Sequence, residues 1–224
     1  MNFNNNGSLM NVMPPVTKNI LLINGIIWIA GFVFQRFGIN LSEILGLHYA
    51  QAHAFNVYQL VTYMFTHEEF MHLFFNMFAL WMFGSTVENA WGSKKFLIYY
   101  MVCGIGAGLT QELVAWSLIG DNPLYHDLYP VTIGASGAVF GLLLAFGMLY
   151  PNAPLYLMFI PIPIKAKYFV IGYGVIELFF GMQNSQTDNV AHFAHLGGML
   201  FGLLLILYWR HGKKKGGGNI YRYK

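Results

Sequence analysis

Residues 133–150 read IGASGAVFGLLLAFGMLY, an apolar segment with one polar side chain, Ser136, near its start. A second apolar segment, residues 191–209, begins AHFAHLGGML and has His195 in a corresponding position. Polar groups at membrane depth are costly and usually functional, and glycines let two helices approach closely. Together the two segments predict a nucleophile and its base that meet inside a bilayer.

The composition is that of an integral membrane protein. Of the 224 residues, 56% are hydrophobic and 9% are charged, whereas soluble domains carry about 25% charged residues. The single cysteine, Cys103, excludes an internal disulfide, and its apolar neighbours predict that it packs without reacting. We expect the lipid bilayer as the surroundings of the protein and no nucleic acid as a partner.

Six apolar segments predict an all-α membrane protein with a bundle of six transmembrane helices. The segments span residues 19–37, 61–83, 96–118, 133–150, 167–182 and 191–209. A spanning helix needs about 20 residues, with about 17–25 usual, so the fifth segment is marginal. Residues 38–60 are expected to be partly helical and to lie at the outer interface. Residues 151–164, with four prolines, are expected to form an irregular cytoplasmic connection.

Lysine and arginine gather in every second connection, which predicts the topology. They are Lys18, Lys94, Lys95, Lys165, Lys167, Arg210, Lys213, Lys214, Lys215, Arg222 and Lys224. The other connections carry acids, and only Arg36 breaks the alternation. Because basic residues gather in cytoplasmic loops, both termini are predicted to be cytoplasmic. A flexible tail (1–17) and a basic tail (210–224) then flank the six-helix domain (18–209).

This topology brings polar side chains from three segments to the outer half of the membrane. Ser136 is expected a turn or less below the outer surface, and His195 about one turn below it. In the second segment His72 and Asn76 are four residues apart and so project from one helix face. An imidazole N–H, a side-chain amide and the Ser136 backbone N–H at a helix N-terminus are suitable donors to the oxyanion of a serine hydrolase.

In these residues the chain resembles the rhomboid intramembrane serine proteases. The matching residues are GASG at 134–137, His195 with Gly198 and Gly202, HLFFN at 72–76, and Gly84 with Glu88. The resemblance covers residues 18–209. It implies a serine-type endopeptidase that cuts peptide bonds in or next to transmembrane segments of other proteins, without a metal or another cofactor. We expect Glu88 to make a structural hydrogen bond at the inner end of the second segment.

Roles for individual residues follow from the resemblance. Ser136 is implied to attack the scissile carbonyl, and His195 to take the serine proton and pass it to the leaving amine. His72, Asn76 and the Ser136 backbone are implied to form the oxyanion hole. Close packing of helices is expected at the glycines Gly134, Gly137, Gly141, Gly198 and Gly202.

The chain departs from the family pattern at two places. Many members carry Trp-Arg in the first outer loop, where this chain has Tyr58-Gln59, so any anchoring of that loop by the arginine is lost. Phe140 stands where a tyrosine often lies beneath the histidine. An aromatic ring is therefore available to stack on His195, while the hydroxyl is missing.

The sequence places no acid to complete a triad, so the prediction is a Ser136–His195 dyad. Asp188 precedes His195 by seven residues and would share its helix face, but it lies at or outside the membrane surface. Glu112 and Glu177 lie near the outer ends of their segments, where we expect structural hydrogen bonds.

Three other interpretations stay open. A catalytically silent rhomboid-like protein would bind membrane clients without cutting them. A small transporter would use the intramembrane histidines and acids, but two inverted halves are not found in the sequence. A metal site would use His192 and His195, which are three residues apart, with His67 or His72.

The resemblance also bears on substrate access and location. It suggests lateral entry of substrate near the second and fifth segments, with residues 183–189 as a cap. The short, aromatic fifth segment suits a movable gate. We expect a bacterial inner membrane, with the active site open to the outer, periplasmic side.

Overall fold

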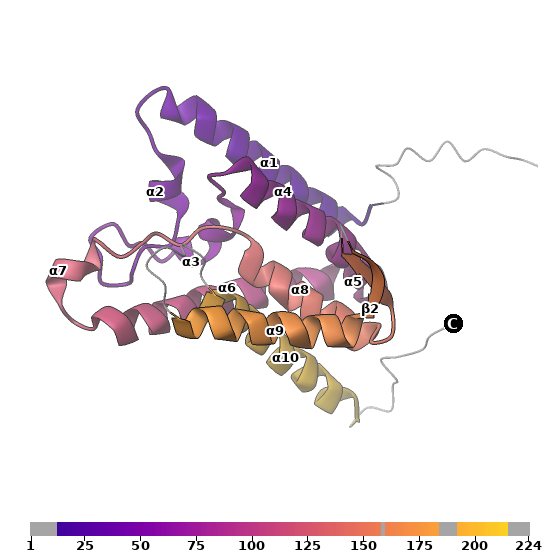
Figure 1. The fold of residues 1–224 in the computed structure, drawn as a ribbon. Coiled ribbons are helices and arrows are strands. Elements are labelled where there is room, and N and C mark those ends of the chain that lie inside the picture. The colour runs from indigo at the N-terminus through magenta and orange to yellow at the C-terminus, as the bar shows by residue number, and fades with distance from the viewer. Residues whose placement is uncertain (1–12, 158–159, 184–191, 215–224) are drawn as a thin grey trace, which may run out of the picture.

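The structure is a computed structural model that describes residues 13–157, 160–183 and 192–214. These residues form a helical bundle with one β-hairpin (Figure 1). In chain order the elements are α1 (Pro15–Gln35), α2 (Leu41–Leu45), α3 (Gln59–Thr62), η2 (Tyr63–Phe65), α4 (Phe70–Ala79), η3 (Leu80–Gly84), α5 (Ser85–Trp91), α6 (Ser93–Ile119), α7 (Pro123–His126), α8 (Ser136–Leu149), β1 (Pro154–Leu157), β2 (Ile160–Lys165), α9 (Ala166–Gln183) and α10 (His192–Lys214). Helices α2, α3 and α7 gather at one end of the bundle, here called the loop end, and the hairpin lies at the other (Figure 1).

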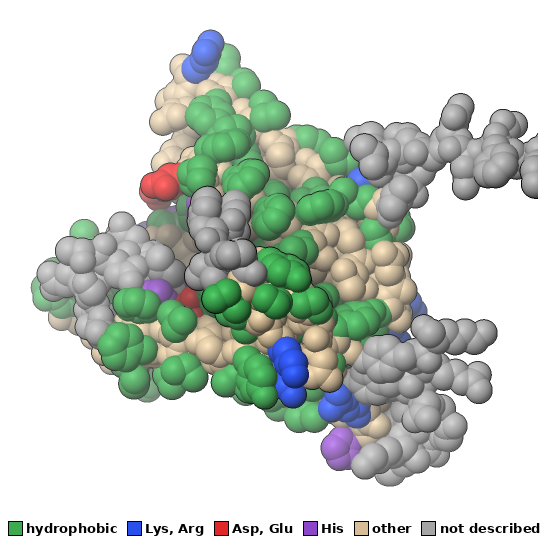
Figure 2. Space-filling view, turned by 45° about the vertical axis from the view of Figure 1, so that its right-hand side comes forward, with side chains coloured by type: hydrophobic (Ala, Val, Ile, Leu, Met, Phe, Trp, Pro, Cys, Tyr) green, Lys and Arg blue, Asp and Glu red, His purple; other side chains and the backbone are tan. Residues whose placement is uncertain are grey.

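Four described helices are long and apolar enough to cross a membrane. They are Pro15–Gln35, Phe70–Trp91, Ser93–Ile119 and His192–His211. Helix α8 is apolar but has 14 residues, and α9 has 18. Hydrophobic side chains cover much of the visible face (Figure 2), and Phe70 and Leu113 are 59% and 64% exposed. Because soluble monomers rarely expose such surface, it fits a multi-pass integral membrane protein, with long helices at four of the six predicted spans.

The predicted second span, 61–83, is wrong at both ends. The helix runs over Phe70–Trp91, through α4, the π-helical turn η3 and α5. Glu69, just before it, has extended backbone angles (φ −95°, ψ 143°). Hydropathy averaged over a window does not detect the short polar run that ends at Glu69. The backbone, however, is not helical there, and the helix begins only after it. As a result His67 lies before the helix, and His72 lies in its first turn.

The first helix begins earlier than predicted, inside the expected tail 1–17. Pro15 opens α1, a position where its missing N–H costs nothing. Thr17 is fully buried, and its backbone N–H and hydroxyl donate to Glu88 Oε2 at 2.7 and 2.8 Å. The hydroxyl of Ser93 donates to the other oxygen of the same carboxylate at 2.7 Å. The structural hydrogen bond expected of Glu88 is confirmed, and it fixes the start of α1.

The connection expected to be irregular, 151–164, contains a pair of antiparallel strands instead. Strands β1 and β2 pair antiparallel, with Pro154 opposite Lys165 and Leu155 opposite Ile164, and the register shifts after Leu155. Both strands of a two-stranded hairpin are edge strands, so proline residues without an N–H are tolerated there. Three of the four prolines, Pro154, Pro161 and Pro163, lie in these strands, so counting prolines misled the prediction.

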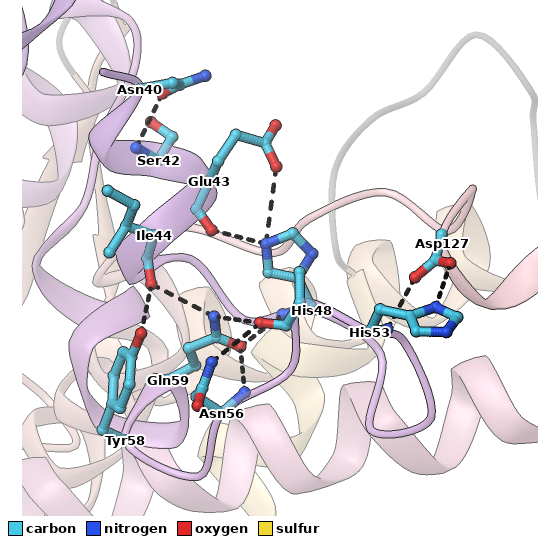
Figure 3. Close-up of polar contacts among 11 residues, drawn as sticks. Asn40, Ser42, Glu43, Ile44, His48, His53, Asn56, Tyr58, Gln59 and Asp127 are labelled. Atoms are coloured by element: carbon cyan, nitrogen blue, oxygen red, sulfur yellow. Dashed lines mark hydrogen bonds and ion pairs between the residues drawn. The ribbon is translucent and has the colours of Figure 1, made fainter.

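Gln59 anchors the loop that follows α1. It is 1% exposed. Its Oε1 accepts the backbone N–H groups of Asn56 (3.1 Å) and His48 (3.4 Å). Its Nε2 donates to the carbonyls of Ala54 (3.1 Å) and Ile44 (3.3 Å), as Figure 3 shows for Ile44. The loop is thus held by the neutral side chain of Gln59. The sequence predicted only that anchoring by an arginine is absent, and it did not predict this role.

We expect Gln59→Ala to lower the free energy of unfolding by about 1–3 kcal/mol, because buried backbone groups of the loop lose their partners. Thermal unfolding in detergent measures this loss. Gln51 is a matched control, since it is exposed in the same loop and donates to Asp121 at 3.0 Å. Gln51→Ala should change stability by less than about 0.5 kcal/mol. Equal losses in the two variants would contradict the anchoring role.

Glu112 and Asp127 accept backbone N–H groups of this loop at the loop end. Glu112 of α6 accepts the backbone N–H of Ala50 at 2.7 Å, which confirms the structural hydrogen bond expected of it. Asp127, after α7, accepts the backbone N–H of His53 at 2.8 Å, and its Oδ2 lies 2.7 Å from the His53 Nδ1 (Figure 3). The hydrogen bond from the His53 side chain lowers the pKa of the Asp127 carboxyl.

Helices α6, α8 and α10 pack together through small residues. An added Cβ would collide with a neighbouring atom at Gly137, Gly141, Gly198 and Gly202. Gly134, the fifth glycine predicted to pack helices together, lies in the turn before α8, and its added Cβ would collide with His72 of α4 instead. At Gly198 the neighbour is the backbone carbonyl of Gly137, so α8 and α10 touch backbone to backbone. The Tyr99 hydroxyl of α6 donates to the Gly141 carbonyl at 2.8 Å, and Cys103 is fully buried, as expected. This packing brings the starts of α8 and α10 together.

Candidate active site

Ser136 begins α8 after a turn that is held at two points. Gly134 in this turn has a φ of +112°, a conformation that residues with a Cβ rarely adopt. Its N–H donates to the Tyr63 carbonyl at 2.9 Å, and the N–H of Ala135 donates to Nε2 of His67 at 3.3 Å. As the first residue of a helix, Ser136 has a backbone N–H without an acceptor inside that helix. This N–H is available to a ligand.

Ser136 and His195 meet where α8 packs against α10. Ser136 Oγ lies 2.8 Å from His195 Nε2, although the residues are 59 positions apart in the sequence. Gly137 follows Ser136 directly and Gly198 lies about one turn after His195, so the backbone contact between these glycines holds the two helix starts at this spacing. His195 is 7% exposed. The candidate nucleophile and base are therefore within hydrogen-bond distance in a shielded place.

Phe140 supports the imidazole of His195 from one face. The two rings are stacked, with centroids 4.2 Å apart and planes 9° from parallel. Phe140 lies one turn after Ser136 on α8, so the same helix supplies the candidate nucleophile and the surface under the base. The stacking fixes the plane of the imidazole ring without a hydroxyl group.

A carboxylate lies behind His195, which the sequence did not predict. Glu177 of α9 is 6% exposed, and its Oε2 lies 2.8 Å from His195 Nδ1. A carboxylate accepts hydrogen bonds, so Nδ1 carries a proton and Nε2 is left to accept the Ser136 hydroxyl. The expectation that no acid stands next to the Ser136–His195 pair is wrong, because the three side chains form one hydrogen-bonded row.

His192 contacts the same carboxylate oxygen. Its Nδ1 lies 2.7 Å from Glu177 Oε2. The possible ligand atoms of Glu177, His192 and His195 lie within 4.8 Å of one another, as in a metal site. Zinc bonds of about 2.0–2.1 Å in a tetrahedron would hold ligand atoms about 3.3 Å apart. The spacings of 2.7 and 2.8 Å fit shared protons better than a metal ion.

His72 and Asn76 lie on one face of α4, beside the turn that precedes Ser136. A Cβ added at Gly134 would lie 2.7 Å from His72 Nε2, and the His72 ring packs edge-on against His67 with centroids 4.9 Å apart. Asn76 is buried, and its Nδ2 donates to the His72 carbonyl at 3.0 Å. An amide nitrogen has two N–H groups. One of them therefore stays available to a ligand.

Helix α9 borders the candidate site and corresponds to the predicted fifth segment (Figure 1). Besides Glu177 it contributes Tyr173, whose ring centroid lies 5.5 Å from that of Phe140. Asp188 lies outside the described residues. The predicted cap, 183–189, also lies outside them except for its first residue.

Residues 54–211 match the profile of the rhomboid domain. The chain is 33% identical over 196 residues to Rhomboid-like protein 11, chloroplastic, of Arabidopsis thaliana, which covers 84% of this chain and 62% of that protein. It is 31% identical over 144 residues to Rhomboid protein 1, mitochondrial, of Saccharomyces cerevisiae, with 62% and 38% covered. It is also 31% identical over 159 residues to Rhomboid protease AarA of Providencia stuartii, with 63% and 52% covered.

The chain thus spans between 38% and 62% of the length of these three relatives. Their names place one in chloroplasts and one in mitochondria, and the third comes from a bacterium. The similarity therefore identifies a type of domain and does not select one kind of membrane.

Proposed function

The chain belongs to the rhomboid family, and on this basis we propose that it is an intramembrane serine endopeptidase. Its substrates are other membrane proteins, cut in or next to a transmembrane segment. The observation that carries the proposal is the 2.8 Å contact between Ser136 Oγ and His195 Nε2 at the starts of two tightly packed helices. A relative named as a rhomboid protease supports the same chemistry. The reaction uses no metal or other cofactor.

In the proposed reaction, Ser136 Oγ attacks the scissile carbonyl carbon while His195 Nε2 takes the hydroxyl proton. His195 then gives this proton to the leaving amine nitrogen as the C–N bond breaks, which leaves an ester on Ser136. Water attacks the ester and gives a proton to Nε2, and the serine oxygen leaves with that proton. One water is consumed, and both side chains return to their starting states.

Three donors are proposed for the oxyanion: His72, Asn76 and the backbone N–H of Ser136. The Ser136 N–H lies at a helix N-terminus, where the helix dipole favours negative charge. His72 borders the turn before Ser136, and the Asn76 amide keeps one N–H beyond its bond to the His72 carbonyl. Donors already in place when charge develops are the largest single contribution to many such reactions.

The topology proposed for this function has six spans and both termini in the cytoplasm, in a bacterial inner membrane. The alternation of basic and acidic connections supports this orientation, which turns the loop end outward. Helices α8 and α9 are then the two short spans. Water reaches Ser136 from the loop end, and a substrate helix enters from the lipid near α4 and α9, which both border the site.

The test is reconstitution of the chain into liposomes with a single-span membrane protein. We expect cleavage of that protein, and labelling of Ser136 by a fluorophosphonate probe located by mass spectrometry. Cleavage that chelators abolish would support the metal site instead. A chain that neither cuts a broad substrate panel nor reacts with the probe would be the catalytically silent, client-binding protein.

Asn76→Ala should lower kcat by about 10–1000-fold with the fold intact, because one oxyanion donor is lost while the others remain. Rates of cleavage at several substrate densities give kcat and KM, and thermal unfolding checks the fold. Asn89 is exposed on the same membrane-spanning helix, so Asn89→Ala is the matched control and should keep the wild-type kcat. An unchanged kcat in Asn76→Ala would remove this residue from the oxyanion hole.

A further inference from the structure

We propose that Glu177 is a positioning residue for His195, so that the site works as a Ser136–His195–Glu177 triad and not as a dyad. The inference rests on the proposed function, since it concerns how the base of that reaction is held. The row of contacts is continuous: Ser136 Oγ lies 2.8 Å from Nε2 of the imidazole, and Glu177 Oε2 lies 2.8 Å from its Nδ1.

The surroundings of Glu177 hold its carboxylate in place. The side chain is buried on the apolar helix α9, and burying a charge is costly unless it is hydrogen-bonded. His192 and His195 lie three residues apart on α10, on one helix face, and both direct Nδ1 to the same oxygen, at 2.7 and 2.8 Å. His192 thereby fixes the carboxylate from one side, and the carboxylate in turn fixes His195.

This contact selects the protonation pattern that the reaction needs. A neutral imidazole carries one N–H, and donating it from Nδ1 to Glu177 leaves the lone pair of Nε2 facing Ser136. In the other tautomer Nε2 would carry the proton and could not accept the one on the serine. When His195 becomes an imidazolium during the reaction, a carboxylate 2.8 Å away also stabilises its charge.

Stacking on Phe140 cannot determine which edge of the His195 ring faces Ser136. A ring stacked at 4.2 Å and 9° constrains the plane of the imidazole. A half-turn of the imidazole about its bond to Cβ keeps that plane and exchanges the positions of its nitrogen and carbon atoms. Only a group at the edge of the ring distinguishes the two orientations, and Glu177 is at that edge.

The experiment compares Glu177→Gln and Glu177→Asp with the control Glu112→Gln. Glu112 is also a carboxylate in an apolar helix, and it accepts a backbone N–H, that of Ala50. The readouts are kcat and KM for a single-span substrate, the rate at which a fluorophosphonate labels Ser136, and the thermal unfolding temperature. A residue that joins α9 to α10 and does nothing more would affect stability but not the labelling rate of folded protein.

We expect Glu177→Gln to lower both kcat and the labelling rate by about 10²–10⁴-fold, which is the contribution that a general base typically makes. KM should change little. Glu177→Asp should recover part of both rates, and Glu112→Gln should match the wild type. Wild-type rates in folded Glu177→Gln would overturn the positioning role and leave the proposed function standing. A wild-type chain that neither cleaves nor labels would overturn both.

Discussion

Ser136→Ala and His195→Ala should each lower kcat by at least about 10⁴-fold while the fold is kept. Without the serine oxygen no ester can form, and without the imidazole of His195 the proposed general base is lost. A general base alone is worth about 10²–10⁴-fold, and loss of the nucleophile or base of a serine protease can cost about 10⁶-fold. Neither change adds volume, so the packing of α8 on α10 should survive.

The effects of the two substitutions on kcat should also be non-additive. Because Ser136 and His195 act as a unit, the double variant should be no slower than either single one. Matched controls are Ser117→Ala on α6 and His211→Ala on α10, both at exposed positions. All variants are assayed for cleavage of one single-span substrate in liposomes and for thermal unfolding. Wild-type cleavage by either single variant would refute the proposed mechanism.

The sequence located Ser136 and His195 relative to each other because both lie near the start of a segment entering from the same side. Helices rise about 1.5 Å per residue, so equal distances from a segment end mean equal depths. The same arithmetic applies to Glu177, which lies five residues before the end of the fifth segment, 167–182. Depth was therefore predictable for all three residues.

The rotation of each helix was not predictable in the same way. Glu177 reaches His195 only because α9 turns that face toward α10, and this orientation depends on contacts between residues far apart in sequence. In the sequence, a single acid in an apolar segment has the same surroundings whether it faces an imidazole or a backbone N–H. Glu112, which accepts the Ala50 N–H, is the second case.

In the loop after α1, contacts between residues far apart in sequence were again not predictable. Its partial helicity was predictable from short apolar stretches, but the role of Gln59 was not. That role comes from four backbone groups which the chain brings around one amide. Hydropathy also placed the second span too early, because it does not register that three polar residues at 67–69 end one local structure and begin another.

Gly198→Ala should destabilise the protein by about 3 kcal/mol or more and lower the rate of cleavage by about 10²-fold or more. The added Cβ would lie 2.7 Å from the carbonyl carbon of Gly137 and closer still to its oxygen. A flexible side chain could turn away from such a contact, but a helix backbone cannot, so α8 and α10 must separate. Overpacking a core typically costs about 1–3 kcal/mol, and a contact between two backbones belongs at the upper end or above it.

Separating α8 from α10 would lower the rate of cleavage by lengthening one distance. Ser136 and His195 lie on the two helices that Gly137 and Gly198 hold together, so moving the helices apart lengthens the 2.8 Å contact between Oγ and Nε2. A misplacement of about 1 Å can cost about 10²-fold in rate. Gly25 is the matched control, because a Cβ there meets no atom within 4 Å, and Gly25→Ala should keep or raise stability. Wild-type unfolding and cleavage in Gly198→Ala would mean that the backbone contact does not set the geometry of the pair.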